Sequence, residues 1–168
     1  MKKLLMLIIV SLSLLTFSCN PKKEIKDSKP EVDYIYEATL DNFKIGNPEL
    51  VVKVQEMHMH LMNKNYEMVS TYFTDNIFFQ LEDGSVLEGK EEVMKFMIDS
   101  FSSIEIENYQ IGVNFAVTTG NGKEWVCLWD SANIVLEDGT SSSHKWMEAF
   151  RFDKDKIDVI NQFGKPKI

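Results

Sequence analysis

Two side chains that can exchange protons stand on one predicted strand. In "HKWMEAFRF", residues 144–152, apolar and polar residues alternate, which predicts a β-strand with His144, Trp146 and Glu148 on one face. A strand with one exposed face normally turns its ionisable groups toward water. Here they share a face with aromatic residues, so we expect His144 and Glu148 to point into a cavity. There they could act in acid–base catalysis or only hold a bound molecule.

His144 and Glu148 do not pair directly in this prediction, because extended strand separates them by about 13 Å. A further histidine, His58, lies on the edge of the apolar stripe of a predicted helix, whereas His60 lies on its polar side. His58 is therefore either a core histidine or another group in the cavity. The two helical histidines stand about 200° apart around the helix, so we expect no metal site there. We also expect no cofactor.

The remaining pattern predicts the elements that must position these groups. Helices are predicted in "GNPELVVKVQEMHMHLMNKN", with Asn47 as its cap, in "YEMVSTYF" and in "KEEVMKFMIDSF". Strands are predicted within 76–89, on both sides of an Asp-Gly turn, and over 104–118, 124–136, 141–152 and 157–163. This order predicts an α+β fold, with the helices packed on one face of a strongly curved antiparallel sheet.

The order and spacing of "FTDNIFF", "LEGKEEVMKFM" and "FRFDKDKIDVINQF" resemble the nuclear transport factor 2-like superfamily, and its SnoaL-like branch in particular. The resemblance covers about residues 47 to 164. It implies a cone-shaped α+β barrel around one pocket, and homodimers that form through the outer face of the sheet. The expected function is binding of a small, largely apolar ligand. The alternative is a cofactor-independent acid–base enzyme (isomerase, dehydratase or hydrolase) that uses Glu148 with His144 or His58.

The run "EAFRF" also resembles the D-H-F-R-F run of ketosteroid isomerases, and this resemblance places Glu148 in the pocket. Counted from the turn at Gly139, the neighbouring strand would place Glu148 opposite Trp129 and point Asp130 outward. The other residues predicted to line the pocket are His58, Trp129, Ser131, Asn133, Trp146, Ile160 and Gln162. Two of the three catalytic positions of those isomerases are Met57 and Leu81 here, so steroid isomerase activity is not expected.

The first residues of the chain predict where the protein is located in the cell. Lys2 and Lys3 precede an apolar run that is too short to span a bilayer, and "TFSCN" follows. The run resembles a bacterial lipoprotein signal, with Cys19 as the residue that would carry the lipid, including palmitate; an ordinary signal peptide is the alternative. We therefore expect a signal peptide over 1–18, a flexible tether over 19–33, a segment packing on the domain over 34–46, and the barrel domain over 47–168.

The chain is acidic, with 18 basic and 26 acidic residues and a formal net charge of −8. It has no basic run, which argues against a nucleic-acid partner, because phosphate contacts require clustered Lys and Arg. The expected partners are a small molecule, a membrane reached through the lipid on Cys19, and a second copy of the chain. The expected location is the bacterial cell envelope, on the periplasmic or outer-membrane face.

Overall fold

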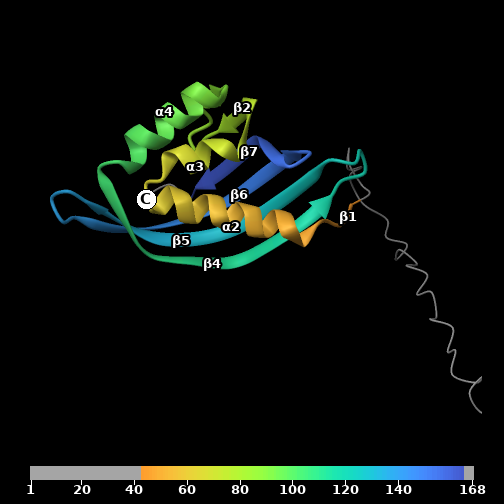
Figure 1. The fold of residues 1–168 in the computed structure, drawn as a ribbon. Coiled ribbons are helices and arrows are strands. Elements are labelled where there is room, and N and C mark those ends of the chain that lie inside the picture. The colour runs from red at the N-terminus through yellow and green to blue at the C-terminus, as the bar shows by residue number, and fades with distance from the viewer. Residues whose placement is uncertain (1–42, 165–168) are drawn as a thin grey trace, which may run out of the picture. The chain divides into compact units, whose positions relative to one another are not determined.

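A computed structural model describes residues 43–164 (Figure 1). The predicted signal peptide, Cys19, the tether and most of the 34–46 segment lie outside the described residues. The helices are α2 (Pro48–Met62), α3 (Tyr66–Thr71) and α4 (Lys90–Phe101). The strands are β1 (Lys44–Ile45), β2 (Phe73–Gln80), β3 (Val86–Glu88), β4 (Ile104–Thr118), β5 (Glu124–Leu136), β6 (Ser141–Asp153) and β7 (Lys156–Gly164). No helix among the described residues is both long and apolar enough to cross a membrane.

The helices begin where the sequence predicts. The side chain of Asn47 accepts a hydrogen bond of 3.0 Å from the N–H of Glu49, and Pro48 occupies the first turn of α2, where a missing N–H costs nothing. Asn65 caps α3 by accepting from the N–H of Met68. The buried stripe of α2 consists of Leu50, Val54, Met57, His58 and Leu61.

The strands form one sheet in the order β1-β4-β5-β6-β7-β2-β3. The sheet is strongly curved but does not close into a barrel, and the helices lie on one of its sides (Figure 1). The expected α+β fold is confirmed. The prediction of an entirely antiparallel sheet is wrong for one pair, because β7 runs parallel to β2. The last strand returns between β6 and β2 and must run in the direction that its hairpin with β6 imposes.

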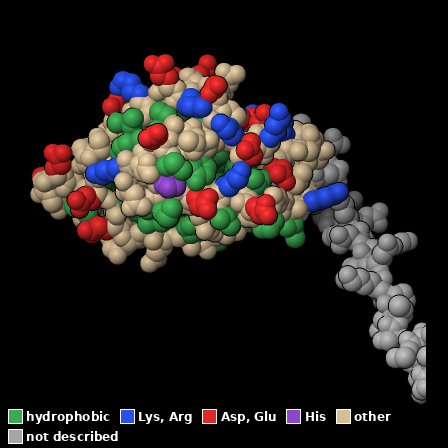
Figure 2. Space-filling model, in the orientation of Figure 1, with side chains coloured by type: hydrophobic (Ala, Val, Ile, Leu, Met, Phe, Trp, Pro, Cys, Tyr) green, Lys and Arg blue, Asp and Glu red, His purple; other side chains and the backbone are tan. Residues whose placement is uncertain are grey.

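The hydrophobic core fills the space between the helices and the sheet. Its largest fully buried side chains include Phe73, Ile77, Met57 and Phe150, which come from α2, β2 and β6. On the face seen in Figure 2, apolar side chains show between the helices, and Lys and Arg are interspersed with Asp and Glu. The core therefore holds α2 against the sheet, with His58 of its buried stripe facing Glu148 on β6.

Two irregularities in β4 change which residues face the helices. The pairing of β4 with β5 shifts between Glu107 and Gln110, where Asn108 has a φ of 52°, and again between Ile111 and Val113. Each bulge adds one residue and so exchanges the two faces of the strand. Ile104 and Ile106 line the inner face before the first bulge, whereas Tyr109 lines it after the bulge.

Candidate functional site

A cavity of about 370 Å³ lies between the helices and the inner face of the sheet. Residues of α2, α4 and strands β2, β4, β5, β6 and β7 line it, and most of them are apolar or aromatic. The polar groups in the lining are His58, Glu82, Ser100, Tyr109, Asp130, His144, Glu148 and Gln162. An apolar cavity with a few convergent polar groups is the usual form of a small-molecule site.

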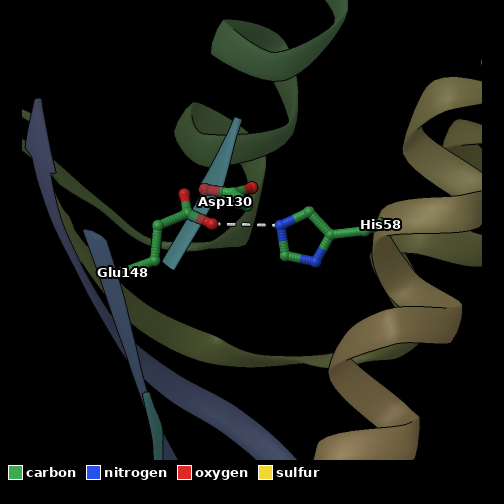
Figure 3. A group of neighbouring side chains, drawn as sticks. All are labelled: His58, Asp130 and Glu148. Atoms are coloured by element: carbon green, nitrogen blue, oxygen red, sulfur yellow. Dashed lines mark hydrogen bonds and ion pairs between the residues drawn. The ribbon is translucent and has the colours of Figure 1, made fainter. Parts of the chain in front are cut away.

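Three ionisable side chains meet in this cavity (Figure 3): His58 from α2, Asp130 from β5 and Glu148 from β6. Each is buried, with 7–8% of its surface exposed. His58 Nε2 lies 3.0 Å from Glu148 Oε2. The other carboxylate oxygen, Oε1, accepts a hydrogen bond of 3.0 Å from the side-chain amide of Gln162 on β7.

The protonation of His58 follows from its second contact. Nδ1 lies 2.8 Å from the carbonyl oxygen of Val54, so Nδ1 must carry a proton and donate it. His58 and Glu148 therefore share one proton along the Nε2–Oε2 hydrogen bond. Burial lowers the pKa of His58, but the hydrogen bond and charge of Glu148, with the Val54 carbonyl and Asp130, raise it above its ordinary value overall. The raised pKa favours the imidazolium form of His58 beside Glu148.

Asp130 is the carboxylate without a strong partner. Burial, together with the neighbouring charge of Glu148, raises the pKa of Asp130 from 3.8 to about 6, although His58 partly offsets this. Its Oδ1 is buried and has no hydrogen-bond partner among the described residues. The hydroxyl of Tyr109 is likewise buried without a partner there, and burial raises the pKa of Tyr109, with a further contribution from the charge of Asp130.

The same three residues are the group that could hold a metal ion. One ligand atom each from His58, Asp130 and Glu148 lies within 4.8 Å of the other two. One imidazole and two carboxylates suit a divalent transition metal, and the Val54 carbonyl would fix Nε2 as the ligand atom. From the sequence no metal site was expected, because the two histidines of α2 lie on different sides of the helix, and Asp130 was predicted to point outward.

Six of the residues predicted from the sequence line the cavity: His58, His144, Trp146, Glu148, Ile160 and Gln162. The structure pairs Glu148 with His58 and not with His144. The Nε2 atom of His144 lies 2.8 Å from the hydroxyl of Ser142, and its ring stacks on Trp146 with centroids 5.4 Å apart. His144 therefore belongs to the wall of the cavity but stands apart from the ionisable cluster.

The other three predicted lining residues, Trp129, Ser131 and Asn133, do not line the cavity, and the prediction that Asp130 points outward is wrong. Glu148 pairs with Leu128, one residue from the expected Trp129. The cause is the turn, in which the N–H of Leu136 donates to the Thr140 carbonyl and Gly139 has a φ of 81°. This turn holds one more residue than the predicted register assumed, and a slip of one residue exchanges the faces of a strand.

Two functional candidates were therefore missed, and each had a different signal. Asp130 could have been found from "EDGT", because a glycine placed to adopt positive φ after a type I turn favours the bulged hairpin. Tyr109 faces the cavity because of the bulge at Asn108. We find no sequence signal for that bulge beyond the tolerance of Asn for positive φ.

Comparisons with known proteins place this geometry in a fold family. Neither a family model nor a curated protein sequence matches the chain. Among solved structures, an LEH-like epoxide hydrolase of M. tuberculosis superposes with a TM-score of 0.58 at 13% identity, covering 70% of this chain and 83% of that one. A protein of Catenulispora acidiphila with a ketosteroid isomerase-like fold, in complex with trimethylamine, gives 0.53 at 15%, covering 70% and 86%.

An NTF2-like protein of unknown function from Cytophaga hutchinsonii is similar over nearly its whole length. It superposes with a TM-score of 0.50 at 14% identity, covering 68% of this chain and 97% of that one. At these identities the similarity establishes the fold and leaves chemistry to the site itself. The chain therefore has the nuclear transport factor 2-like fold, shared with SnoaL-like and ketosteroid isomerase-like proteins.

Proposed function

We propose that this protein is an acid–base enzyme (an isomerase, dehydratase or hydrolase) that acts on a small, largely apolar molecule. The observation that carries the proposal is the meeting of His58, Asp130 and Glu148, whose polar atoms lie within 4.8 Å of one another in an apolar cavity. Proton transfer requires donor and acceptor within hydrogen-bond reach of the same substrate atoms. A cavity that needed only to bind an apolar molecule would gain nothing from burying two carboxylates, which cost free energy to desolvate.

The contacts assign different roles to the two carboxylates. Both oxygens of Glu148 are engaged, one with His58 and the other with Gln162. The proton near Glu148 Oε2 in this arrangement is the one in its hydrogen bond with His58 Nε2. Asp130 has an unpartnered oxygen and a pKa of about 6, so at neutral pH it is mostly ionised and can accept a proton. We assign Asp130 as the general base and the imidazolium of His58 as the proton donor. A pKa near the working pH is the condition under which a general base is most effective.

A ligand-binding role without catalysis is the second candidate, and the mostly apolar lining of the cavity favours it. In that case His58, Glu148 and Gln162 would be a satisfied polar network, and Asp130 would bind the polar end of the ligand. The two candidates differ in one measurable respect, since only an enzyme exchanges protons with the bound molecule.

Solvent exchange tests the proposal directly. The purified full chain is incubated in deuterated water with acetophenone, a small apolar ketone with exchangeable methyl protons, and deuterium incorporation is followed by mass spectrometry. We expect incorporation above background and a loss of about 100-fold or more in Asp130→Asn. His60→Asn, which alters the polar side of the same helix, should keep the rate. Equal rates for wild type and Asp130→Asn would refute the assignment of the base.

We further propose that a lipid on Cys19 holds the domain at the bacterial cell envelope. The basic residues, apolar run and cysteine of the first 19 residues support this proposal. Bacteria that express the full chain should incorporate labelled palmitate into it, and Cys19→Ser should remove the label. Cys127→Ser, which changes a half-buried strand cysteine, is the matched control and should keep the label. Equal labelling of the two variants would contradict the anchor.

A further inference from the structure

Two polar atoms in the cavity have no well-aligned hydrogen-bond partner among the described residues, although their side chains lie close enough for each to shift the pKa of the other. They are of complementary kinds. The Tyr109 hydroxyl can donate a hydrogen bond, and Asp130 Oδ1 can accept one. Both atoms are buried, and both residues line the cavity. A buried polar group without a partner carries a desolvation penalty, so each such group in a folded protein calls for an explanation.

The two atoms face the same part of the cavity. The ring of Tyr109 stacks on the ring of His58 with centroids 5.9 Å apart, and the ligand atoms of His58 and Asp130 lie within 4.8 Å. Asp130 also contributes to the raised pKa of Tyr109, both through its charge and through a side-chain contact with the hydroxyl, so the two groups lie beside each other. Three other polar groups there already have partners, since His58 and Gln162 each hydrogen-bond to Glu148. Tyr109 and Asp130 are thus the polar groups beside His58 that are left to meet a ligand, while Glu82 and Ser100 line other parts of the cavity wall.

The charge of the cavity restricts that ligand further. Its lining contains Glu82, Asp130 and Glu148 but, among the described residues, neither Lys nor Arg. The one buried imidazolium, His58, is already paired with Glu148. A carboxylate or phosphate would therefore lie beside like charges in a site of low dielectric constant, where repulsion is strong.

We propose that Tyr109 and Asp130 together recognise an uncharged ligand group that offers a hydrogen-bond acceptor beside an N–H or O–H donor. A primary amide and an α-hydroxy ketone have this arrangement. The acceptor oxygen accepts a hydrogen bond from the Tyr109 hydroxyl, and the adjacent N–H or O–H donates one to Asp130 Oδ1. The inference rests on the proposed function in one respect. If Asp130 is the general base, the proton of the ligand's N–H or O–H group is the one that it would remove.

Three probe molecules of nearly equal shape separate the effects of the ligand's acceptor, its donor and its charge on affinity. Benzamide offers an acceptor and a donor, acetophenone offers the acceptor alone, and benzoate carries a negative charge. Dissociation constants for the full chain are measured by titration calorimetry or by ligand chemical shifts. We expect benzamide to bind about tenfold more tightly than acetophenone, the step that one satisfied buried hydrogen bond supports. Benzoate should bind more weakly than both.

Two variants assign the preference to the two residues. Tyr109→Phe should weaken benzamide and acetophenone alike, by about tenfold, because both use the acceptor contact. Asp130→Leu, which removes the acceptor at similar volume, should abolish the preference for benzamide over acetophenone. Tyr66→Phe is the matched control, because the Tyr66 hydroxyl is also buried and unpartnered but does not line the cavity. It should change none of the three constants.

The inference is overturned if benzoate binds as tightly as benzamide, if Tyr109→Phe binds like wild type, or if neither benzamide nor acetophenone binds the wild type. Equal affinities for benzamide and acetophenone would also overturn it, since water would then satisfy Asp130. Tyr109→Phe retains the ring and its packing, so its result stands even if Asp130→Leu does not fold. The deuterium exchange of acetophenone is measured separately, so recognition can hold while catalysis fails, and the reverse.

Discussion

Asp130 shows how one carboxyl group can combine a functional position with a cost to stability. Its side chain is buried beside Glu148, and its pKa rises from 3.8 to about 6. The folded protein therefore holds this proton more tightly than the unfolded chain does. Between these two values protonation favours the folded state, and the ionisation of Asp130 at higher pH opposes folding.

Because ionisation of Asp130 opposes folding, the stability of the protein should depend on pH through this residue. Asp130→Asn removes the ionisation, so the melting temperature of the variant should exceed that of the wild type at about pH 8, and the difference should shrink toward about pH 4. Thermal unfolding followed by circular dichroism across this range measures it. A difference that does not change with pH would show that the pKa of Asp130 is the same in the folded and unfolded states.

Glu148 allows a second test, because two substitutions remove different parts of its role. Glu148→Gln retains a donor for Nε2 of a neutral His58, so we expect a loss of about 1 kcal/mol or less in the free energy of unfolding. Glu148→Ala leaves the buried His58 and Gln162 without their partner, and the loss should reach about 2–4 kcal/mol. Urea unfolding of both variants provides the comparison. Equal losses would mean that the hydrogen bond of His58 contributes little.

Among the elements, the long strands and the helices were predictable because their signals are local. The caps at Asn47 and Asn65 and the alternation in β6 need no knowledge of the rest of the chain. The register between strands was harder to predict from the sequence, since the geometry of one turn decides it. The shift at Gly139 moved Asp130 into the site and Trp129 out of it, and the bulge at Asn108 brought in Tyr109. The fold thus followed from the pattern, whereas the positions of Asp130 and Tyr109 depended on shifts of one residue in the strand pairing.

The turn at Gly139 yields a prediction at this scale. Gly139 has a φ of 81°, and an added Cβ would meet no atom within 4 Å, so any cost of substitution arises from the backbone alone. Gly139→Ala should lower the free energy of unfolding by about 1 kcal/mol, and Gly139→Asn should cost less, because Asn tolerates the left-handed conformation. Urea unfolding would show the order. A harmless alanine would indicate that the turn can relax without loss.

At the scale of the whole domain, the outer face of the sheet carries exposed apolar side chains. Val113, Trp129, Met147 and Phe163 are aligned neighbours on β4, β5, β6 and β7. They are 38%, 46%, 42% and 51% exposed, respectively, so an apolar row crosses the width of four strands. Contiguous apolar surface of this kind usually marks an interface, and the row supports the expectation of a homodimer.

A charge placed in this row should separate the subunits. We expect the full chain to be a dimer by analytical ultracentrifugation, and Trp129→Glu to be a folded monomer, because a buried unpaired carboxylate opposes association. Met59→Glu adds the same charge at an exposed apolar position on α2 and should remain dimeric. A Trp129→Glu dimer beside a Met59→Glu monomer would place the interface on the helices instead.

The parallel pairing of β7 with β2 affects the order in which the strands can assemble into the sheet. Among the described residues, the β2–β3 hairpin pairs with the rest of the sheet only through β7, which follows every other described strand along the chain. Until that strand inserts, the early hairpin has no neighbour, and Glu148 lacks the amide of Gln162. A chain truncated before Lys156 would contain His58, Asp130 and Glu148 and yet lack the strand that joins the β2–β3 hairpin to the rest of the sheet, so we expect it to leave the cavity incomplete.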